Sequence, residues 1–433
     1  MKRSLVLLML FFFPYEMVAD DWPQWMGPGR DNIWREVGIL ERLPKGQLKP
    51  LWKSRVAGGY SGPAVSQGKV FMTDFVTLDP VKVDNFGRKT FTGTERVLCF
   101  GESDGTLRWK HEYPVTYTIS YPSGPRCTPT VSGNKVYALG AEGNLFCFDV
   151  ESGKKIWAKA LKQEYNTKSA LWGYASHPLV DGNKLICTVG GEGSHTVAFH
   201  KDTGKELWRS QSAKDQGYCP PSIIKAGGVR QLIIGHTTAI ASLDPESGRE
   251  NWVVPYGTTI GSVIMTPVQS GEHLFFGAFS NNNLLVKLAK DKPAAEVVWK
   301  NLPRAGMAPV NGQPILDGST LYGVDQNGAL MGVELASGKR LWTTPRPIGN
   351  RLGDSGTAFI VRHGKHYFFF VETGHLVTGT LTPKGFVETS RAFLLAPTNN
   401  AYGREVIWCP PAFANKRIYV RNDEELACFS LAE

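Results

Sequence analysis

Short apolar runs, each bounded by turn residues, recur along almost the whole chain after residue 50. One recurring piece reads as an apolar strand, an Asp, a Ser or Thr, a Gly, a Lys or Arg, and then a Trp four residues after the Gly. Gly153 with Trp157 and Gly204 with Trp208 are two copies of this piece. Asp and Gly supply the turn of a hairpin, and the Trp falls on the returning strand. The pattern therefore predicts β-hairpins that carry a Trp at a fixed place.

A second pair of apolar runs precedes each hairpin. In one copy, Pro129 leads the first run, and Gly133 with Asn134 turns the chain into the second run. Each unit therefore contains four predicted strands, and the proline-led strand is the first of them. Eight such units begin at Pro63, Pro129, Pro178, Pro221, Pro267, Pro314, Ala358 and Pro411.

The spacing of the units selects the fold. Neighbouring tryptophans of the pattern from Trp109 to Trp342 are 43 to 51 residues apart, and one four-stranded propeller blade takes roughly 40–50 residues. A single four-stranded sheet leaves both faces uncovered, whereas sheets stacked around an axis cover one another. We therefore predict an all-β fold, an eight-bladed β-propeller of four-stranded antiparallel blades.

The two ends of the chain indicate how the ring closes. The eighth unit stops at Glu433 without a Trp strand, whereas Trp52 has no hairpin before it. We expect the N-terminal strand around Trp52 to complete the last blade and so to remove the open edges of the ring. The seventh unit also lacks a Trp, and Phe386 or a neighbour is expected in its place. The expected organisation is a signal peptide at 1–19, an N-terminal segment at 20–47 and the propeller at 48–433.

The first residues are typical of an exported protein. Lys2 and Arg3 precede the apolar run Leu5–Phe13, which is too short to span a bilayer, and Ala19 is a possible cleavage point. No cysteine precedes Cys99, so we expect no lipid anchor. The prediction is a periplasmic or extracellular monomer that does not span a membrane.

Charge and cysteine usage exclude two classes of protein. The net charge is +9, but the basic residues are scattered rather than clustered, which argues against nucleic acid binding. Seven cysteines, none adjacent, do not form a disulfide framework. One set recurs at a strand position expected in the core: Cys99, Cys147 and Cys428. Another set lies just before the first strand of its unit, where a thiolate metal site stays an alternative: Cys127, Cys219 and Cys409.

The hairpins with turn, Gly, Lys, two residues and Trp resemble the PQQ-binding-like β-propeller repeat family over about residues 50 to 433. Trp22 to Trp25 with Gly27 to Asp31 also look like the N-terminal segment of exported members. In this family, quinoprotein alcohol dehydrogenases hold PQQ and calcium over the ring centre. BamB-like outer-membrane assembly factors instead bind partners without a cofactor. The resemblance therefore implies the fold and leaves these two functions open.

The sequence lacks several features of the dehydrogenases. Adjacent cysteines and a Cys-x-x-Cys-His haem motif are absent from it. A calcium site would need several oxygen ligands that converge, yet the candidates fall in different units, where turn roles are expected. We predict no catalytic residue, no metal site and no cofactor, with PQQ and calcium as the alternative. The calcium candidates are Glu142, Glu192, Asp325, Asn327 and Asp354.

The segments before the first strands of the units are expected to line one mouth of the central channel. They combine aromatic residues with Arg and His, which is typical of binding hot spots. Arg126, His177, Tyr218 and Trp408 are expected to face one funnel, although rim aromatics that merely plug the channel are the alternative. Residues 75–95 form an insertion that either contacts a partner or only extends a hairpin. The candidate site residues are Arg126, Trp172, Tyr174, His177, Tyr218, Asp354 and Trp408.

These observations favour an extracytoplasmic, non-catalytic binding or scaffold propeller. Its expected partner is an envelope protein or a small ligand at the channel mouth. The alternative is a PQQ- and calcium-dependent dehydrogenase, and carbohydrate binding or a new enzyme activity ranks behind both.

Overall fold

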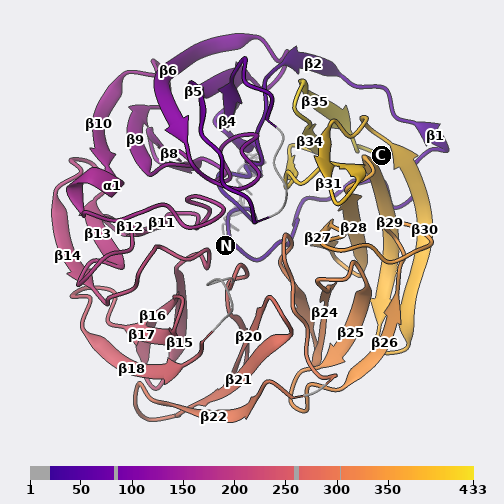
Figure 1. Ribbon diagram of the computed structural model, residues 1–433. Coiled ribbons are helices and arrows are strands. Elements are labelled where there is room, and N and C mark those ends of the chain that lie inside the picture. Colours follow the sequence, from indigo (N-terminus) through magenta and orange to yellow (C-terminus); the bar gives the residue numbers. More distant parts are fainter. Residues whose placement is uncertain (1–19, 82–85, 258–262, 303) are drawn as a thin grey trace, which may run out of the picture.

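The computed structural model describes residues 20–81, 86–257, 263–302 and 304–433. Eight sheets of at least four strands surround a central axis in this part of the chain, in sequence order around the ring (Figure 1). The four strands of the repeat pair antiparallel, as in the third blade. The predicted all-β, eight-bladed propeller is confirmed.

The first four blades follow the predicted units. Each begins with a short inner strand and ends with the Trp-bearing outer strand. They consist of β3 (Ala64–Ser66), β4 (Lys69–Val76), β5 (Phe91–Gly101) and β6 (Leu107–Tyr117); β7 (Thr130–Ser132), β8 (Lys135–Leu139), β9 (Asn144–Asp149) and β10 (Lys155–Ala160); β11 (Leu179–Asp181), β12 (Lys184–Thr188), β13 (Thr196–His200) and β14 (Glu206–Ser210); and β15 (Ser222–Ala226), β16 (Val229–Gly235), β17 (Ala239–Leu243) and β18 (Glu250–Pro255). The short helix α1 (Leu161–Glu164) follows β10.

The remaining blades keep this order except at the end of the ring. They consist of β19 (Val268–Ser270), β20 (His273–Ala278), β21 (Asn282–Leu288) and β22 (Ala295–Lys300); β23 (Ile315–Asp317), β24 (Thr320–Val324), β25 (Leu330–Glu334) and β26 (Arg340–Thr344); β27 (Ala358–His363), β28 (His366–Val371), β29 (His375–Thr382) and β30 (Gly385–Phe393); and β33 (Ala412–Ala414), β34 (Arg417–Arg421) and β35 (Glu425–Ser430). A small hairpin, β31 (Asn399–Ala401) with β32 (Arg404–Val406), separates blades seven and eight.

Strand β2 (Trp52–Arg55) closes the ring as predicted. It pairs antiparallel with β35, so that Trp52 lies opposite Cys428, and becomes the outer strand of blade eight. Its indole Nε1–H donates to the carbonyl of Glu102 in blade one at 2.8 Å.

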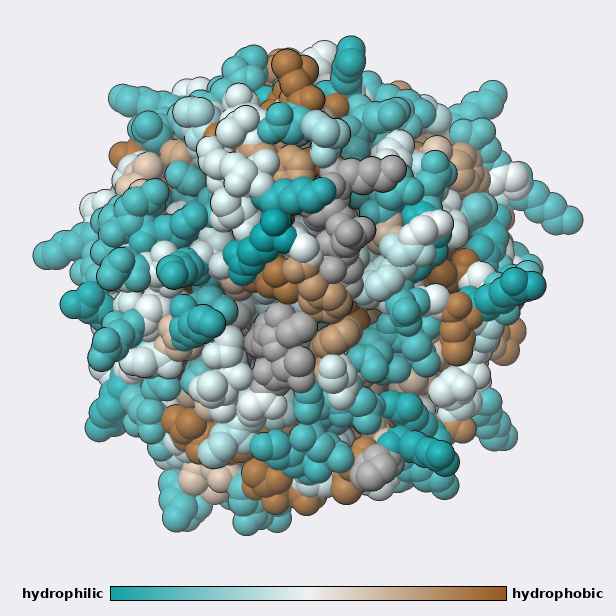
Figure 2. Space-filling model, in the orientation of Figure 1, coloured by the Kyte–Doolittle hydropathy of each residue, from teal (hydrophilic) through white to brown (hydrophobic). Residues whose placement is uncertain are grey.

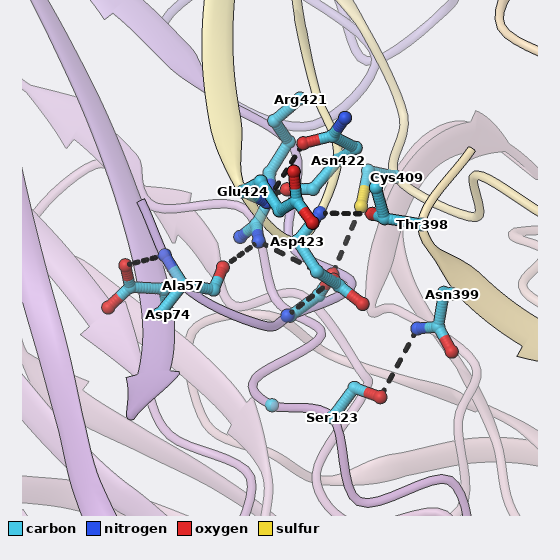
Figure 3. Close-up of polar contacts among 12 residues, drawn as sticks. Ala57, Asp74, Ser123, Thr398, Asn399, Cys409, Arg421, Asn422, Asp423 and Glu424 are labelled. Carbon is cyan, nitrogen blue, oxygen red and sulfur yellow. Dashed lines mark hydrogen bonds and ion pairs between the residues drawn. The ribbon is translucent and has the colours of Figure 1, made fainter. Parts of the chain in front are cut away.

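A buried arginine fastens the same seam, which Figure 3 shows. Arg421 of β34 is 0% exposed. Its Nη1 donates to the carbonyl of Thr73 at 3.0 Å, and its Nη2 donates to the carbonyl of Ala57. The carboxylate of Asp423 lies 3.8 Å from Nη2 and accepts the backbone N–H of Gly59 at 3.1 Å. The ring is therefore closed between blades eight and one by polar contacts as well as by the pairing of β2 with β35.

The recurring tryptophans pack between blades. A Cβ placed on the turn glycine of the next blade would lie within 3.0 Å of the indole, so only glycine fits beneath the ring. Five indole Nε1–H groups also donate to a carbonyl of the next blade. The Trp and Gly pairs are Trp52 and Gly105, Trp109 and Gly153, Trp157 and Gly204, Trp208 and Gly248, and Trp299 and Gly338.

In blade seven, Phe386 does not take the place of the Trp, contrary to expectation. In blades one to six the sheet register shifts directly after the residue opposite the Trp. In blade seven the residue before the shift is Thr378, which faces Ser390. Ser390, rather than Phe386, therefore occupies the place of the Trp. Its hydroxyl accepts the backbone N–H of Leu43 at 2.8 Å. The parallel strand β1 (Gly46–Gln47) then covers the edge of β30, giving this blade a fifth strand.

The N-terminal segment is built into the propeller. Trp22 pairs with Val65 of β3, and the carbonyl of Pro23 accepts the N–H of Val131 in β7. Trp34 is buried against Phe368 and Phe413 of blades seven and eight. The indigo chain accordingly runs from near the ring centre out to β1 (Figure 1).

Candidate functional site

The rim segments are held in place by acidic side chains from the second strand of a blade or the turn that follows it. The carboxylate of Asp74 accepts the backbone N–H of Ala57 at 2.8 Å, and Glu142 accepts that of Thr118 at 2.9 Å. Asp325 with Ala308 and Glu372 with Thr357 repeat the contact at 2.8 and 3.0 Å. Because each acceptor belongs to a blade, these hydrogen bonds tie the rim segments to the sheets.

One cavity lies where these segments converge at the channel mouth, and we call it the funnel. Its volume is about 170 Å³. Five of the seven predicted site residues line it, and its whole lining contains ten Phe, Trp and Tyr side chains. The five are Arg126, Trp172, His177, Tyr218 and Trp408. In the view of Figure 2, apolar residues gather near the ring centre within a largely polar surface.

Two predicted site residues do not line the funnel. Tyr174 is fully buried in the core between blades two and three, and its hydroxyl donates to the carbonyl of Val189 at 3.2 Å. Asp354 is exposed, and its neighbour Ser355 lines the funnel instead. Both residues lie in rim segments, but their side chains point away because the backbone turns between neighbouring positions.

The funnel floor comes from the N-terminal segment. Trp25 stacks on His177 with ring centroids 4.5 Å apart and planes 13° apart. Arg30 lies over the Trp25 ring at 5.7 Å and donates to the carbonyl of Pro178 at 3.0 Å. Burial lowers the pKa of Arg30 to about 10, so the side chain remains a cation at neutral pH. Burial and the nearby Arg30 lower the pKa of His177 well below its ordinary value, so the imidazole is neutral.

Arg126 forms part of the wall. Its Nη2 donates to the carbonyl of Ser120 at 2.8 Å and to that of Tyr121 at 2.6 Å, and its Nη1 donates to that of Gly124. The guanidinium also lies over the ring of Tyr60 at 5.0 Å. These contacts fix the side chain but add no negative charge, so the wall carries a cation.

The funnel also receives aromatic residues from the insertion and from two hairpins, which are Phe86, Phe279 and Tyr402. Phe86 of the insertion reaches Trp172 at 5.8 Å and Phe279 of blade five at 6.4 Å. Tyr402 belongs to the hairpin of β31 and β32. The sequence marked the insertion as a candidate contact, but it held no sign that the insertion reaches blades three and five.

The three rim cysteines are buried thiols that join neighbouring blades. Cys219 Sγ lies 3.2 Å from the carbonyl of Met265, and Cys409 Sγ lies 3.1 Å from that of Gly59. Cys127 makes the corresponding, longer contact with Tyr174 at 3.7 Å. Burial raises the pKa of Cys219 and of Cys409 to about 12. Thiols turned toward different blades do not form the thiolate metal site held open above.

The calcium candidates are not brought together. Glu142 and Asp325 accept the rim N–H groups described above, and the amide oxygen of Asn327 accepts the N–H of Ala329 in its own turn. Glu192 and Asp354 are exposed on separate turns. Across the described residues, no three His, Cys, Asp or Glu side chains form a group suited to a metal ion. The donor set therefore does not fit the calcium that accompanies PQQ, and we derive no step through that cofactor.

Comparison with known proteins identifies the family. A family model described as outer membrane protein assembly factor BamB matches residues 93–344, more than half of the chain. The chain belongs to this family.

Curated relatives include members of the BamB family and quinoproteins. The BamB of Shewanella oneidensis is 25% identical over 54% of the chain and 61% of its own length. The quinoprotein ethanol dehydrogenase of Pseudomonas aeruginosa is 24% identical over 49% of the chain and 37% of its own length. The chain therefore spans about three fifths, or less, of the length of these relatives.

Solved structures support the same fold. BamB from Moraxella catarrhalis superposes with a TM-score of 0.55 at 15% identity, over 88% of this chain and 97% of that one. The quinohemoprotein alcohol dehydrogenase of Comamonas testosteroni gives 0.58 at 12% identity, over 95% and 81%. In the part of the chain that the structure describes, no helix has the length and hydropathy needed to cross a bilayer.

Proposed function

We propose that this member of the BamB family is an exported, non-catalytic binding protein that takes up a ligand or an envelope partner at the funnel. The convergence of Arg126, Trp172, His177, Tyr218 and Trp408 on one aromatic cavity supports this proposal. Aromatic residues beside an arginine in a concave, largely buried site are the usual anchors of binding. The relatives named as outer membrane protein assembly factors favour a role in the cell envelope.

Export is part of the proposal, and its signal lies outside the described residues. Cell fractionation with N-terminal sequencing tests it. We expect the mature chain to begin near Asp20 and to accumulate outside the cytoplasm. A cytoplasmic chain that retains Met1 would contradict export.

Titration of the mature protein with PQQ and calcium separates binding from dehydrogenase activity. Tryptophan fluorescence and melting temperature are followed together. We expect no binding at tens of micromolar, because Glu142 and Asp325 accept rim N–H groups and the exposed candidates lie on separate turns. Saturable binding near 1 μM, which corresponds to about −8 kcal/mol, with a matching rise in melting temperature, would instead establish the quinoprotein alternative.

A further inference from the structure

The funnel holds hydrogen-bonding groups that no described residue satisfies. The indole Nε1 of Trp172 is buried without a partner among the described residues. Both ring nitrogens of His177, which is 8% exposed, are also buried without one. Both side chains line the funnel. Unsatisfied buried donors are costly in a folded protein, and a ligand with an acceptor group would relieve that cost.

The charge of the funnel selects among possible acceptors. Arg126 is the charged side chain among its described lining residues, and no Asp or Glu lines the funnel with it. Its described partners are neutral carbonyls, so its charge is not cancelled. Arg30 adds a second cation beneath the floor. An acceptor that carries a negative charge therefore fits this site better than a neutral acceptor or a cation.

The size and lining of the funnel limit the rest of the ligand. A volume of about 170 Å³ is below the roughly 300–1,000 Å³ of sites for drug-sized ligands. The walls are aromatic, and aromatic rings pack favourably against one another in offset or edge-on arrangements. A single ring would fill this space without requiring further polar partners.

We propose that the funnel binds a small aromatic monocarboxylate, whose ring packs against the aromatic wall and whose carboxylate accepts from Trp172 Nε1–H and His177. The inference rests on the proposed binding function and adds the chemistry of the ligand. A single ring with one carboxylate is smaller than the tricyclic PQQ and needs no metal ion.

A matched pair of probes tests the charge requirement. 4-Fluorophenylacetate and 4-fluorophenylacetamide share a ring, but only the first carries a carboxylate, and ligand-observed fluorine NMR measures both. We expect the acid to bind the mature protein with a dissociation constant below about 1 mM. The amide should bind at least tenfold more weakly, because it lacks the charge that complements Arg126.

Substitutions place the site. Trp172→Phe keeps an aromatic ring and removes the indole N–H, so it should weaken acid binding at least fivefold. The loss for the amide should be smaller, because its carbonyl accepts the same hydrogen bond without a charge. Trp342→Phe is the matched control, since its indole donates to Thr382 on the outer edge of the propeller. His177→Leu is a second variant, which removes the unsatisfied imidazole. Circular dichroism and melting temperature show which variants are folded.

Three results would overturn the inference. Equal affinity for acid and amide would remove the carboxylate requirement while leaving a binding function in place. No binding of either probe would exclude this ligand class, and the PQQ titration and fractionation would still judge the proposed function separately. Acid binding that survives both funnel substitutions would place the ligand elsewhere.

Discussion

At the scale of single residues, the rim uses buried polar groups to join neighbouring blades. The thiols of Cys127, Cys219 and Cys409 each contact a carbonyl of the next blade. The hydroxyl of Ser176 makes the same kind of contact with the carbonyl of Cys219 at 3.0 Å. These buried thiols therefore act as weak hydrogen-bond donors that join one blade to the next. A reactive role is less favoured, because burial suppresses formation of the thiolate.

Thiol labelling tests this interpretation. All seven cysteines are buried, and none forms a disulfide. Burial raises the pKa of Cys99, Cys147 and Cys428 to about 12, as it does for Cys219 and Cys409. A maleimide reagent at pH 7 should label none of them in the folded protein and all seven in denaturant. Rapid labelling of one cysteine under native conditions would contradict the assigned role.

Buried histidines predict how stability depends on pH. Burial, with a smaller effect of the neighbouring His236, lowers the pKa of His195 to about 3. In the unfolded chain the His195 imidazole binds a proton near pH 6.5, whereas in the folded chain it stays neutral at this pH. The contribution of His195 is therefore present above pH 6.5 and is lost as the pH falls toward 3.

His195→Gln should remove this dependence. Between pH 6.5 and 5, the free energy of unfolding of the variant should fall less steeply than that of the natural protein, by about 1.4 kcal/mol per pH unit. Urea unfolding at several pH values measures both slopes. Above pH 7.5 the two curves should run parallel, which serves as the internal control. Equal slopes below pH 6.5 would show that His195 does not titrate in this way.

The sequence predicted which segments form the rim, but not the direction in which each of their side chains points. Arg126, Trp172 and His177 reach the funnel, whereas Tyr174 turns into the core two residues after Trp172. The rim segments are irregular loops, so no period of two or 3.6 residues tells which position faces inward. The prediction that Asp354 lines the funnel was wrong for the same reason.

At the scale of elements, the hairpin repeat is a docking device between blades. The indole of one blade lies on the turn glycine of the next, and this glycine has a positive φ in each of the five pairs. The glycine therefore serves two needs at once, a left-handed turn and a close approach. The sequence predicted the hairpins because both residues sit in one short stretch.

Two glycine substitutions separate these needs. Gly248 and Gly182 have φ values of +70° and +61°, but a Cβ would lie 2.5 Å from Trp208 Cε3 only at Gly248, with nothing within 4 Å at Gly182. Gly182→Ala should therefore cost only the turn strain, about 1–2 kcal/mol. Gly248→Ala should cost a further 1–3 kcal/mol or so from overpacking. Urea unfolding measures both variants, and equal losses would contradict docking.

At the scale of the whole molecule, the N-terminal segment and the ring depend on each other. The segment supplies Trp25 to the funnel floor and Leu43 to blade seven, and the closing strand with Trp52 follows it. The unmatched strands at the two ends made the closure predictable from sequence. The path across the channel was not predictable, because residues 20–47 carry no repeat and their partners come from distant blades.

The single side chain of Arg421 makes several of the contacts that close the ring. It is fully buried, and its guanidinium satisfies the carbonyls of Ala57 and Thr73 and faces the carboxylate of Asp423. Burial raises the pKa of Asp423, and Arg421 opposes that shift. Removing the guanidinium would take a donor from the carbonyls of Ala57, Thr73 and Asn422, and the Ser61 hydroxyl would still donate to Thr73. It would also leave the carboxyl group of Asp423 without its cation in a buried seam.

Arg421→Met should therefore lower the free energy of unfolding by about 3–5 kcal/mol, as breaking a buried ion pair does. Arg417→Met on the same strand is the control, since Arg417 is half-buried and lies 3.6 Å from Glu102. The control should cost less than about 1 kcal/mol. Urea unfolding compares the two variants with the natural protein. Similar small losses of stability in both variants would mean that strand pairing by β2 alone holds the ring closed. A large loss for Arg421→Met alone would show that the Arg421 side chain helps to close the ring.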